Sequence, residues 1–316
     1  MGKGAEERAI STRAAMTMID KSSSGFFGGL ASSYKWRACA GDKGETLEDT
    51  VCRHLKIAKI EAGDLIDFGA VYVRGRMERN PSITLSGEEE ISISFPAYGT
   101  RKFYEIDQDR ILFRDPHILI YDKEAGIPCQ HVPYDAYNNV FSALQRHIAR
   151  EQKSKPYAAI LHRLDRETSG VLLFGLEKDV NAFLGWAFKE GRLKKEYLAW
   201  IERSPQKDSW TSDSEIGKVK GKYVAVNRGE GKKAQTFFRV LRREKERALV
   251  LAIPATGRTH QIRIHLAQAG HPVLGDRAYG ARPDDRLYLH AWRLKLKHPV
   301  SGKIFSFEAP IPDGMK

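Results

Sequence analysis

The sequence predicts an α+β protein, in which a small N-terminal α/β domain precedes a larger domain with a mixed, largely antiparallel sheet. Two observations predict this class. Beyond residue 110, apolar runs of strand length outnumber helical segments, and they do not alternate regularly with helices as they would around a parallel sheet. The chain of 316 residues is long enough for one large and one small domain, and its 41% hydrophobic content is ordinary for a globular protein.

The N-terminal third of the chain divides into an arm and a module. Residues 1–44 are rich in Gly, Ser and Lys, which predicts a loosely ordered arm. Residues 45–98 have the pattern of a compact module, in which Thr46 can cap a first helix and Gly69 can end a second. The expected elements are helices from 46 to about 54 and from 57 to 68, and strands over 71–73 and 91–95.

The remainder of the chain is expected to form a linker and the large domain. Residues 99–110 are polar and are taken as the linker, and residues 111–316 as the domain. Within it, a helix follows Asp179 and ends at Gly191, because apolar residues recur between them at helical spacing. The predicted strands cover 118–121, 171–174, 197–201, 236–240 and 248–253.

The charge of the chain indicates a polyanionic partner. The formal net charge is +12 and the pI is about 9.5, although an excess of solvated surface lysine would give the same values. The three cysteines never form a C-x-x-C pair, which argues against a disulfide scaffold or zinc knuckle and favours the reducing cytoplasm. No apolar run reaches the roughly 18 residues of a membrane span, and no secretion signal is evident, so no membrane partner is expected.

The most informative segment is His162–Gly170, which reads H-R-L-D-R-E-T-S-G. It places the carboxylate of Asp165 between two arginines, directly before a Thr-Ser-Gly turn. Nearby guanidinium groups favour the ionised form of a carboxylate, and arginine is well shaped to bind phosphates and base edges. The segment therefore indicates carboxylate chemistry on a nucleic acid.

Three further segments accompany this motif. Residues 118–128 run from a strand into a turn that contains glycine, and residues 191–199 form a cationic turn that delivers Tyr197 at the start of a strand. The third segment, residues 255–267, contains G-R-T-H-Q-I-R-I-H-L and is followed by residues 270–276. In their order and spacing, these segments and the H-R-L-D motif resemble the RluA-type pseudouridine synthases over roughly residues 111–312.

The N-terminal module supports the same resemblance. Residues 64–75, preceded by two predicted helices, resemble the S4 RNA-binding module that members of this family often carry. The chain departs from the family pattern in one turn. Relatives usually have Lys-Pro before the glycine of the first segment, whereas here Lys123 is followed by Glu124-Ala125. We therefore expect this turn to be less rigid.

The resemblance implies that the protein isomerises specific uridines to pseudouridine in structured RNA, with ribosomal RNA favoured and transfer RNA possible. The N1–C1′ bond of the uridine is broken, and the base turns and rejoins the sugar through C5. No hydrolysis, redox change or group transfer results, so we expect neither a cofactor nor a metal, and the chain has no Walker A string. The resemblance makes Asp165 the catalytic aspartate. A carboxylate could attack C1′, remove the 2′ proton or attack C6, and the sequence leaves all three open.

Arg263 and Tyr197 are the other expected catalytic residues. If Thr259 caps a helix, Arg263 projects at the margin of its buried side and can reach Asp165, with Arg258 as the second choice. Tyr197 is expected to stack on the everted base, and its hydroxyl could help to remove the C5 proton. The expected RNA contacts are His162, Arg163, Arg166, Arg192, Lys194, Lys195, Arg258, His260, Arg74 and Arg76.

Two other functions remain open at this stage. A non-catalytic RNA-binding or ribosome-assembly factor could share the fold, although it would have no reason to keep an arginine-paired carboxylate. A nucleoside hydrolase would need a second catalytic carboxylate, and none of the four segments offers one beside Asp165. The expected partner is RNA alone, without a nucleotide cofactor, and a monomer is the default.

Overall fold

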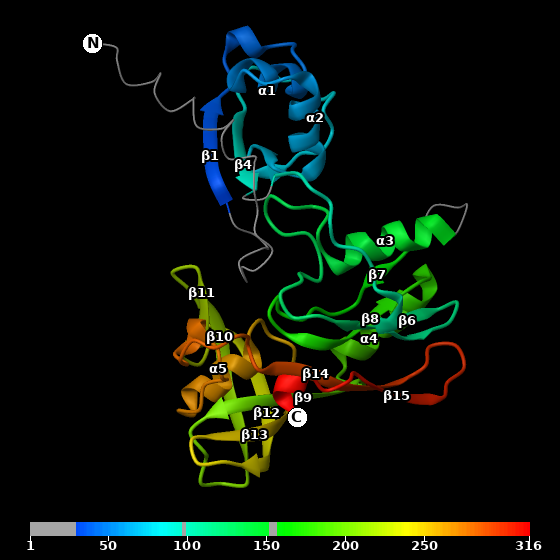
Figure 1. Cartoon of the computed structure of the whole chain (residues 1–316), viewed down its shortest axis with the longest axis vertical. Coiled ribbons are helices and arrows are strands. Elements are labelled where there is room, and N and C mark those ends of the chain that lie inside the picture. Colours follow the sequence, from blue (N-terminus) through cyan, green and yellow to red (C-terminus); the bar gives the residue numbers. More distant parts are fainter. Residues whose placement is uncertain (1–29, 97–98, 152–156) are drawn as a thin grey trace. The chain divides into compact units, whose positions relative to one another are not determined.

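The computed structural model describes residues 30–96, 99–151 and 157–316 (Figure 1). The chain divides into two compact units. The N-terminal unit contains the described residues up to Tyr104 together with Gln130–Ser142, and the larger unit contains Glu105–Cys129 and Ala143–Lys316. We describe each unit by itself.

The N-terminal unit packs two helices against a four-stranded antiparallel sheet. The Thr46 hydroxyl accepts a hydrogen bond from the Asp49 backbone N–H at 3.1 Å and so caps the first helix, while Gly69 ends the second in the left-handed conformation. The sheet order is β1-β4-β2-β3, and the core is apolar and buried. The predicted helices and strands of this module are confirmed. The elements are β1 (Leu30–Arg37), η1 (Ala40–Asp42), α1 (Leu47–Leu55), α2 (Lys59–Phe68), β2 (Val71–Val73), β3 (Arg76–Met77) and β4 (Glu90–Pro96).

The boundaries of this unit differ from those predicted. Strand β1 lies within the predicted arm but pairs with β4 along its length; residues 1–29 of that arm lie outside the described residues. The segment Gln130–Ser142, assigned by the sequence to the large domain, also belongs here. Ala136 donates its N–H to the Phe68 carbonyl at 2.9 Å, and the Tyr137 hydroxyl donates to Asp67 at 2.7 Å. Because these polar groups find their partners on the module, the segment packs there.

The larger unit is built on one mixed sheet with the order β11-β10-β12-β13-β9-β14-β8-β6-β5. β15 pairs with β14 and β7 with β8. Among the described pairs, β14 and β8 run parallel and the others are antiparallel, which confirms the predicted sheet type. The strands are β5 (Ile111–Arg114), β6 (Ile118–Lys123), β7 (Ala159–Ile160), β8 (Ser169–Gly175), β9 (Lys194–Glu202), β10 (Ser209–Val219), β11 (Lys222–Val226), β12 (Lys232–Arg243), β13 (Arg247–Pro254), β14 (Leu289–Lys297) and β15 (Ile304–Glu308).

The helices of this region include the one predicted after Asp179 and a shorter one at the G-R-T-H segment. The first packs with β6 and β8, and the second packs over β10, β12 and β13. The predicted cap at Thr259 is wrong, because the second helix begins at Gln261 and His260 occupies the cap position with a φ of 57°. The elements are η2 (Gln108–Arg110), α3 (Val140–Glu151), α4 (Lys178–Lys189), α5 (Gln261–Gln268), η3 (Arg277–Tyr279) and η4 (Asp313–Met315).

Gly170 explains the glycine of the H-R-L-D-R-E-T-S-G motif. It lies on β8 opposite Ala291 of β14, at the parallel pairing, with a φ of +112°. A Cβ at this position would lie 2.2 Å from the Ala291 carbonyl oxygen, so only glycine allows the two strands to approach. The loop that carries Asp165 therefore leads directly into a tightly paired central strand.

Cysteines and helix lengths are plain in the described residues. Cys39, Cys52 and Cys129 are all free thiols. No helix within the three described ranges combines the length and the apolar character that crossing a membrane requires.

Candidate active site

Asp165 lies in the loop between β7 and β8, and the backbone of this loop is held on both sides. The Asp165 carbonyl accepts the Thr168 N–H at 3.0 Å. The Leu164 N–H donates to the buried thiol of Cys129, and that thiol donates to the Leu164 carbonyl, each at 3.2 Å. The Asp165 side chain is 25% exposed. A partly exposed carboxylate is thus presented from a fixed loop.

Lys123 holds this loop from inside the protein. Its side chain is fully buried, and the ammonium donates to the carbonyls of Glu124, Ile127 and Arg166 at 2.7, 2.7 and 3.0 Å. Burial lowers the pKa of Lys123 to about 8. Three carbonyl acceptors nevertheless match the three donors of an ammonium. The turn that we expected to be less rigid without proline is therefore fastened to the Asp165 loop by a buried cation.

Arg263 forms the ion pair predicted for Asp165. Its Nη1 donates to Asp165 Oδ2 at 3.1 Å, while Nε and Nη2 donate to the two carboxylate oxygens of Asp276 at 2.7 and 2.8 Å. The Arg263 side chain is 9% exposed and that of Asp276 is fully buried. Burial acts to lower the pKa of Arg263, but Asp276 and then Asp165 outweigh it and raise this pKa. The guanidinium is clamped by one carboxylate and presents its remaining edge to the other.

The arginines beside Asp165 in the sequence do not provide this pair. Arg166 Nε donates to Glu167 at 2.8 Å instead, and both side chains are nearly half exposed. Arg163 is exposed at the surface. The ion pair that the structure gives Asp165 comes from Arg263, 98 positions later, as the sequence analysis expected.

His260 and Tyr279 complete the surroundings of the carboxylate. His260 Nε2 is 3.8 Å from Asp165 Oδ1, and its Nδ1 is 2.7 Å from the Tyr279 hydroxyl. That hydroxyl donates its single proton to the Tyr223 carbonyl at 2.9 Å, so Nδ1 of His260 is the donor in the other bond. Burial lowers the pKa of His260, and Asp165 acts in the opposite direction. His260, predicted as an RNA contact, thus lies beside the carboxylate itself.

Tyr197 faces the same site from β9. It pairs in register with Ala252 of β13 and Ala291 of β14. Burial raises the pKa of Tyr197, and the charge of Asp165 adds to the effect. The phenol is therefore protonated at neutral pH, which suits a hydrogen-bond donor or a stacking surface better than the base that we considered for the C5 proton.

The two lysines before Tyr197 lie on opposite faces of β9. Lys195 lies on the same face as Tyr197. Its Nζ would lie 3.6 Å from a Cβ placed at Gly257 of the G-R-T-H segment. Lys194 faces away and forms an ion pair with Glu196 at 2.7 Å. Lys195 thus belongs to the site, whereas the prediction for Lys194 is not supported.

His162 also has a different place from the one predicted. Its Nε2 accepts the Leu173 N–H at 3.0 Å, and its ring stacks on Phe188 with centroids 5.0 Å apart. Burial lowers the pKa of His162 to about 3, so the ring is neutral and serves the packing of the domain. The structure does not support it as an RNA contact.

The other predicted RNA contacts are spread over the two units. Arg192 lies 5.8 Å from the ring centroid of Trp186, and Arg258 Nε donates to the Lys233 carbonyl at 3.0 Å. Arg74 and Arg76 are exposed residues of the N-terminal unit, and Arg74 pairs with Glu89 at 3.3 Å.

Asp276 and Tyr279 are the site residues that the sequence analysis missed. They follow α5 in an irregular segment, where no period or cap identifies a contact. The preceding Gly275 was the available signal. It has a φ of +77°, and a Cβ there would lie 1.9 Å from the Arg286 carbonyl oxygen, so this turn is closely constrained.

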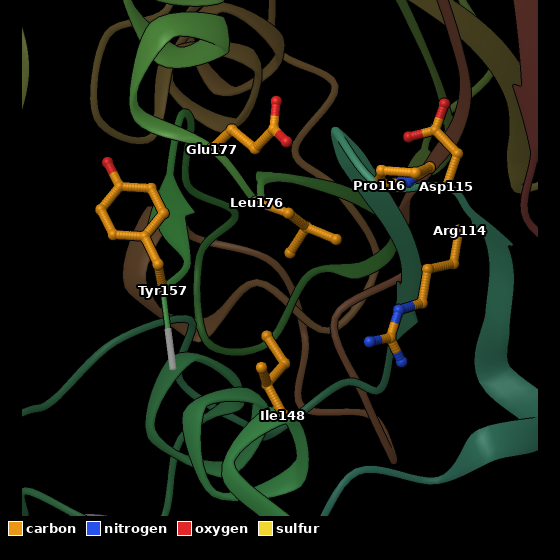
Figure 2. A pocket seen from close by; sticks show the side chains of 7 residues that line it. All are labelled: Arg114, Asp115, Pro116, Ile148, Tyr157, Leu176 and Glu177. Carbon is orange, nitrogen blue, oxygen red and sulfur yellow. The ribbon is translucent and has the colours of Figure 1, made fainter. Parts of the chain in front are cut away.

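A separate hollow of about 520 Å³ lies in the larger unit (Figure 2). Its lining contains none of the residues around Asp165. Two of its lining residues contact residues outside the lining: Glu177 lies 2.7 Å from His117 Nδ1, and Arg114 pairs with Glu151 at 2.7 Å. The lining residues are Arg114, Asp115, Pro116, Ile148, Tyr157, Leu176 and Glu177.

The chain is similar in sequence to known proteins. The family model for RNA pseudouridylate synthase matches residues 117–268. Ribosomal large subunit pseudouridine synthase D of Nitrosomonas europaea is 36% identical over 219 residues, which cover 65% of this chain and 63% of that protein. Ribosomal large subunit pseudouridine synthase C of Escherichia coli O157:H7 is 31% identical over 272 residues, 82% of this chain and 79% of that protein.

Solved structures agree on the fold. The structure of human RNA Pseudouridylate Synthase Domain Containing 4 matches with a TM-score of 0.56 at 23% identity, over 66% of this chain and 90% of that one. The matched family model and the two relatives thus define the class of protein as an RNA pseudouridylate synthase. The chain belongs to the RluA-type family of RNA pseudouridine synthases.

Proposed function

We propose that this protein converts uridine to pseudouridine in large-subunit ribosomal RNA, with Asp165 acting at the glycosidic bond. One observation carries the proposal: the partly exposed Asp165 carboxylate is held by Arg263, whose other edge is clamped by the fully buried Asp276. The choice of ribosomal RNA rests on the two relatives above, both named as synthases of the ribosomal large subunit.

The neighbours of Asp165 supply orientation. Whichever atom of the nucleoside the carboxylate meets, it must arrive as an anion with one rotamer, and the charge and geometry of Arg263 favour both. The protonated phenol of Tyr197 offers a flat surface for an everted uracil and a hydrogen-bond donor at its rim. The reaction rearranges the atoms of one nucleotide, so these residues need to orient it and move protons without binding a second substrate.

Exposed cations around the site would hold the RNA. Arg163, Arg166, Arg192 and Arg258 are exposed, and Lys195 is half-buried near Gly257. We also propose that the N-terminal unit acts as an S4-like RNA-binding module, because it joins two helices to a small sheet and exposes Arg76 on the short strand β3. RNA is the proposed partner, and the protein is proposed to act as a monomer.

The test is an Asp165→Asn variant, which nearly preserves shape and removes the charge. We expect it to bind a transcript of large-subunit RNA as the parent does but to form no detectable pseudouridine. Asp179→Asn, at an exposed position in the first turn of α4, serves as the matched control and should remain active. Pseudouridine formed by the Asp165→Asn protein would refute the catalytic assignment.

The substrate requires a separate experiment. Pseudouridines can be mapped in ribosomal and transfer RNA from cells with and without the gene. We expect sites in large-subunit RNA to disappear. Loss confined to transfer RNA would reject the ribosomal substrate and leave the role of Asp165 standing.

A further inference from the structure

The hairpin formed by β10 and β11, with the loop into β12, carries an unusual density of positive charge. From Gly217 to Lys233 the chain has six cationic residues and one acidic residue. We call this segment the basic hairpin. β11 is an edge strand of the larger sheet and stands beside α5 in the larger unit (Figure 1). Its cations are Lys218, Lys220, Lys222, Arg228, Lys232 and Lys233.

All six cations are exposed. Lys222 donates to the Ala278 carbonyl, but none of the six forms an ion pair among the described residues. Glu215 lies opposite Lys233 in register and accepts the backbone N–H groups of Gly229 and Gly231 at 2.8 and 3.0 Å. Glu230, the acidic residue within the segment, is exposed. Six cations against one acidic residue leave the hairpin with a net positive charge that a partner can bind.

The hairpin is joined to the Asp165 site by direct contacts. The Tyr223 carbonyl accepts the Tyr279 hydroxyl at 2.9 Å, and the Tyr223 ring meets the His260 ring edge-on, with centroids 6.2 Å apart. Lys222 donates to the Ala278 carbonyl and lies 5.1 Å from the Tyr279 ring centroid. His260 is in turn 3.8 Å from Asp165. One side chain thus separates the hairpin from the carboxylate.

The register places two of the lysines on the face toward this site. Ile216 packs with Ile264 of α5, and Lys232 lies directly opposite Ile216. Lys218 lies directly opposite Tyr223, with its Nζ 5.9 Å from the tyrosine ring centroid. Directly paired residues of neighbouring strands share a face, so this face alternates cations with an aromatic ring, a combination typical of surfaces that bind single-stranded nucleic acid.

We propose that the basic hairpin binds the phosphate backbone of the substrate RNA beside the nucleotide held at Asp165. This inference rests on the proposed function and adds a second RNA contact to it. An RNA strand continues on both sides of the modified nucleotide, so its phosphates must pass close to the nearest exposed cations. Lysine is a compact point charge suited to phosphates, and backbone contacts fix position without reading sequence. An acidic protein would have no reason to bind so near the catalytic carboxylate.

The test removes three of the charges in one variant, Lys218→Gln, Lys220→Gln and Lys232→Gln. Binding is measured in the full chain carrying Asp165→Asn, so that the RNA is not converted, with a transcript of large-subunit RNA at several salt concentrations. Each lost phosphate contact on a single strand lowers the slope of log K against log salt by about 0.7. We expect the slope to fall by about 2 and the Kd at physiological salt to rise about tenfold.

The matched control carries Lys295→Gln, Lys297→Gln and Lys303→Gln. These lysines belong to the β14–β15 hairpin, are exposed and form no ion pair among the described residues. The control changes the net charge of the protein by the same amount and should keep the parent's slope. An unchanged slope in the basic-hairpin variant, or an equal loss in both variants, overturns the proposal.

Activity separates this inference from the proposed function. In the chain with Asp165, the basic-hairpin substitutions should raise KM about tenfold while kcat changes much less. If the parent forms pseudouridine but the variant matches it in KM and in salt slope, the hairpin proposal is rejected and the proposed function stands. If the parent forms no pseudouridine in any RNA while the variant still loses salt-dependent RNA binding, the hairpin binds RNA and the proposed function falls.

Discussion

The clamp on Arg263 offers the sharpest test of how the site is held. Asp276 accepts two hydrogen bonds from Arg263 and is fully buried. In Asp276→Asn, the amide can accept one of these bonds but turns its NH2 group toward the other guanidinium N–H. One buried donor then lacks an acceptor, which costs about 1–3 kcal/mol, and loss of one partner of a buried ion pair costs about 3–5 kcal/mol. Asp165 still faces the guanidinium, so we expect a loss of about 3 kcal/mol in the free energy of unfolding.

The same change should reduce the rate of the reaction. Arg263 would no longer be fixed from behind, and Asp165 would lose its single orientation. A misplacement of about 1 Å in a catalytic group costs about 100-fold in rate, so we expect pseudouridine formation under single turnover to slow by about that factor. RNA affinity should change little, because Asp276 is buried and does not meet the RNA.

Two measurements check this reasoning, urea unfolding for stability and single-turnover formation of pseudouridine for rate. Asp285→Asn, an exposed carboxylate in the segment that follows Asp276, is the control and should behave as the parent does. A stable and fully active Asp276→Asn protein would refute the clamp. A protein that is destabilised but keeps the parent's rate would show that Asp276 supports the fold without orienting Asp165.

Two further predictions concern stability. Gly170→Ala should lower the free energy of unfolding in urea by at least about 3 kcal/mol, because its Cβ would meet the Ala291 carbonyl. The control is Gly185→Ala, which has open space in α4 and should be neutral or stabilising. A stable Gly170→Ala protein would contradict the close strand contact. Burial lowers the pKa of His162 to about 3 from 6.5, so the unfolded chain holds this proton more tightly and stability is lost as pH falls below about 6.5. The amide of His162→Gln can still accept the Leu173 N–H. Between pH 7 and pH 5, we expect this variant to lose about 2 kcal/mol less free energy of unfolding than the parent. Identical profiles of unfolding free energy against pH would show that His162 is not the acid-sensitive group.

Local patterns in the sequence were sufficient for most of the secondary structure. The hydroxyl of Thr46, the glycine at 69 and the apolar periods act within a few residues of the chain, so they predict α1, α2 and the central strands without knowledge of packing. The α5 cap failed because His260 takes an unusual backbone conformation there, and its ring makes its hydrogen bond with Tyr279, far along the chain.

Local sequence patterns do not predict the boundary between the two units. Residues 130–142 carry no signal that assigns them to either unit. Their place is decided by hydrogen bonds from Ala136 and Tyr137 to Phe68 and Asp67, about seventy positions earlier. Only the folded chain brings those partners together, because polar groups that leave water must find acceptors wherever packing supplies them.

The candidate site divides in the same way. By itself, the sequence determined the family, the carboxylate proposed as catalytic and the arginine that pairs with it, because those residues lie in long motifs with a fixed order. The tertiary structure decided what holds them: Asp276 behind Arg263, Lys123 beneath the loop, and β9 alternation that turns Lys195 toward the site and Lys194 away. Ion pairs and buried donors are set by distances between segments remote in the chain, and spacing along a sequence does not contain those distances.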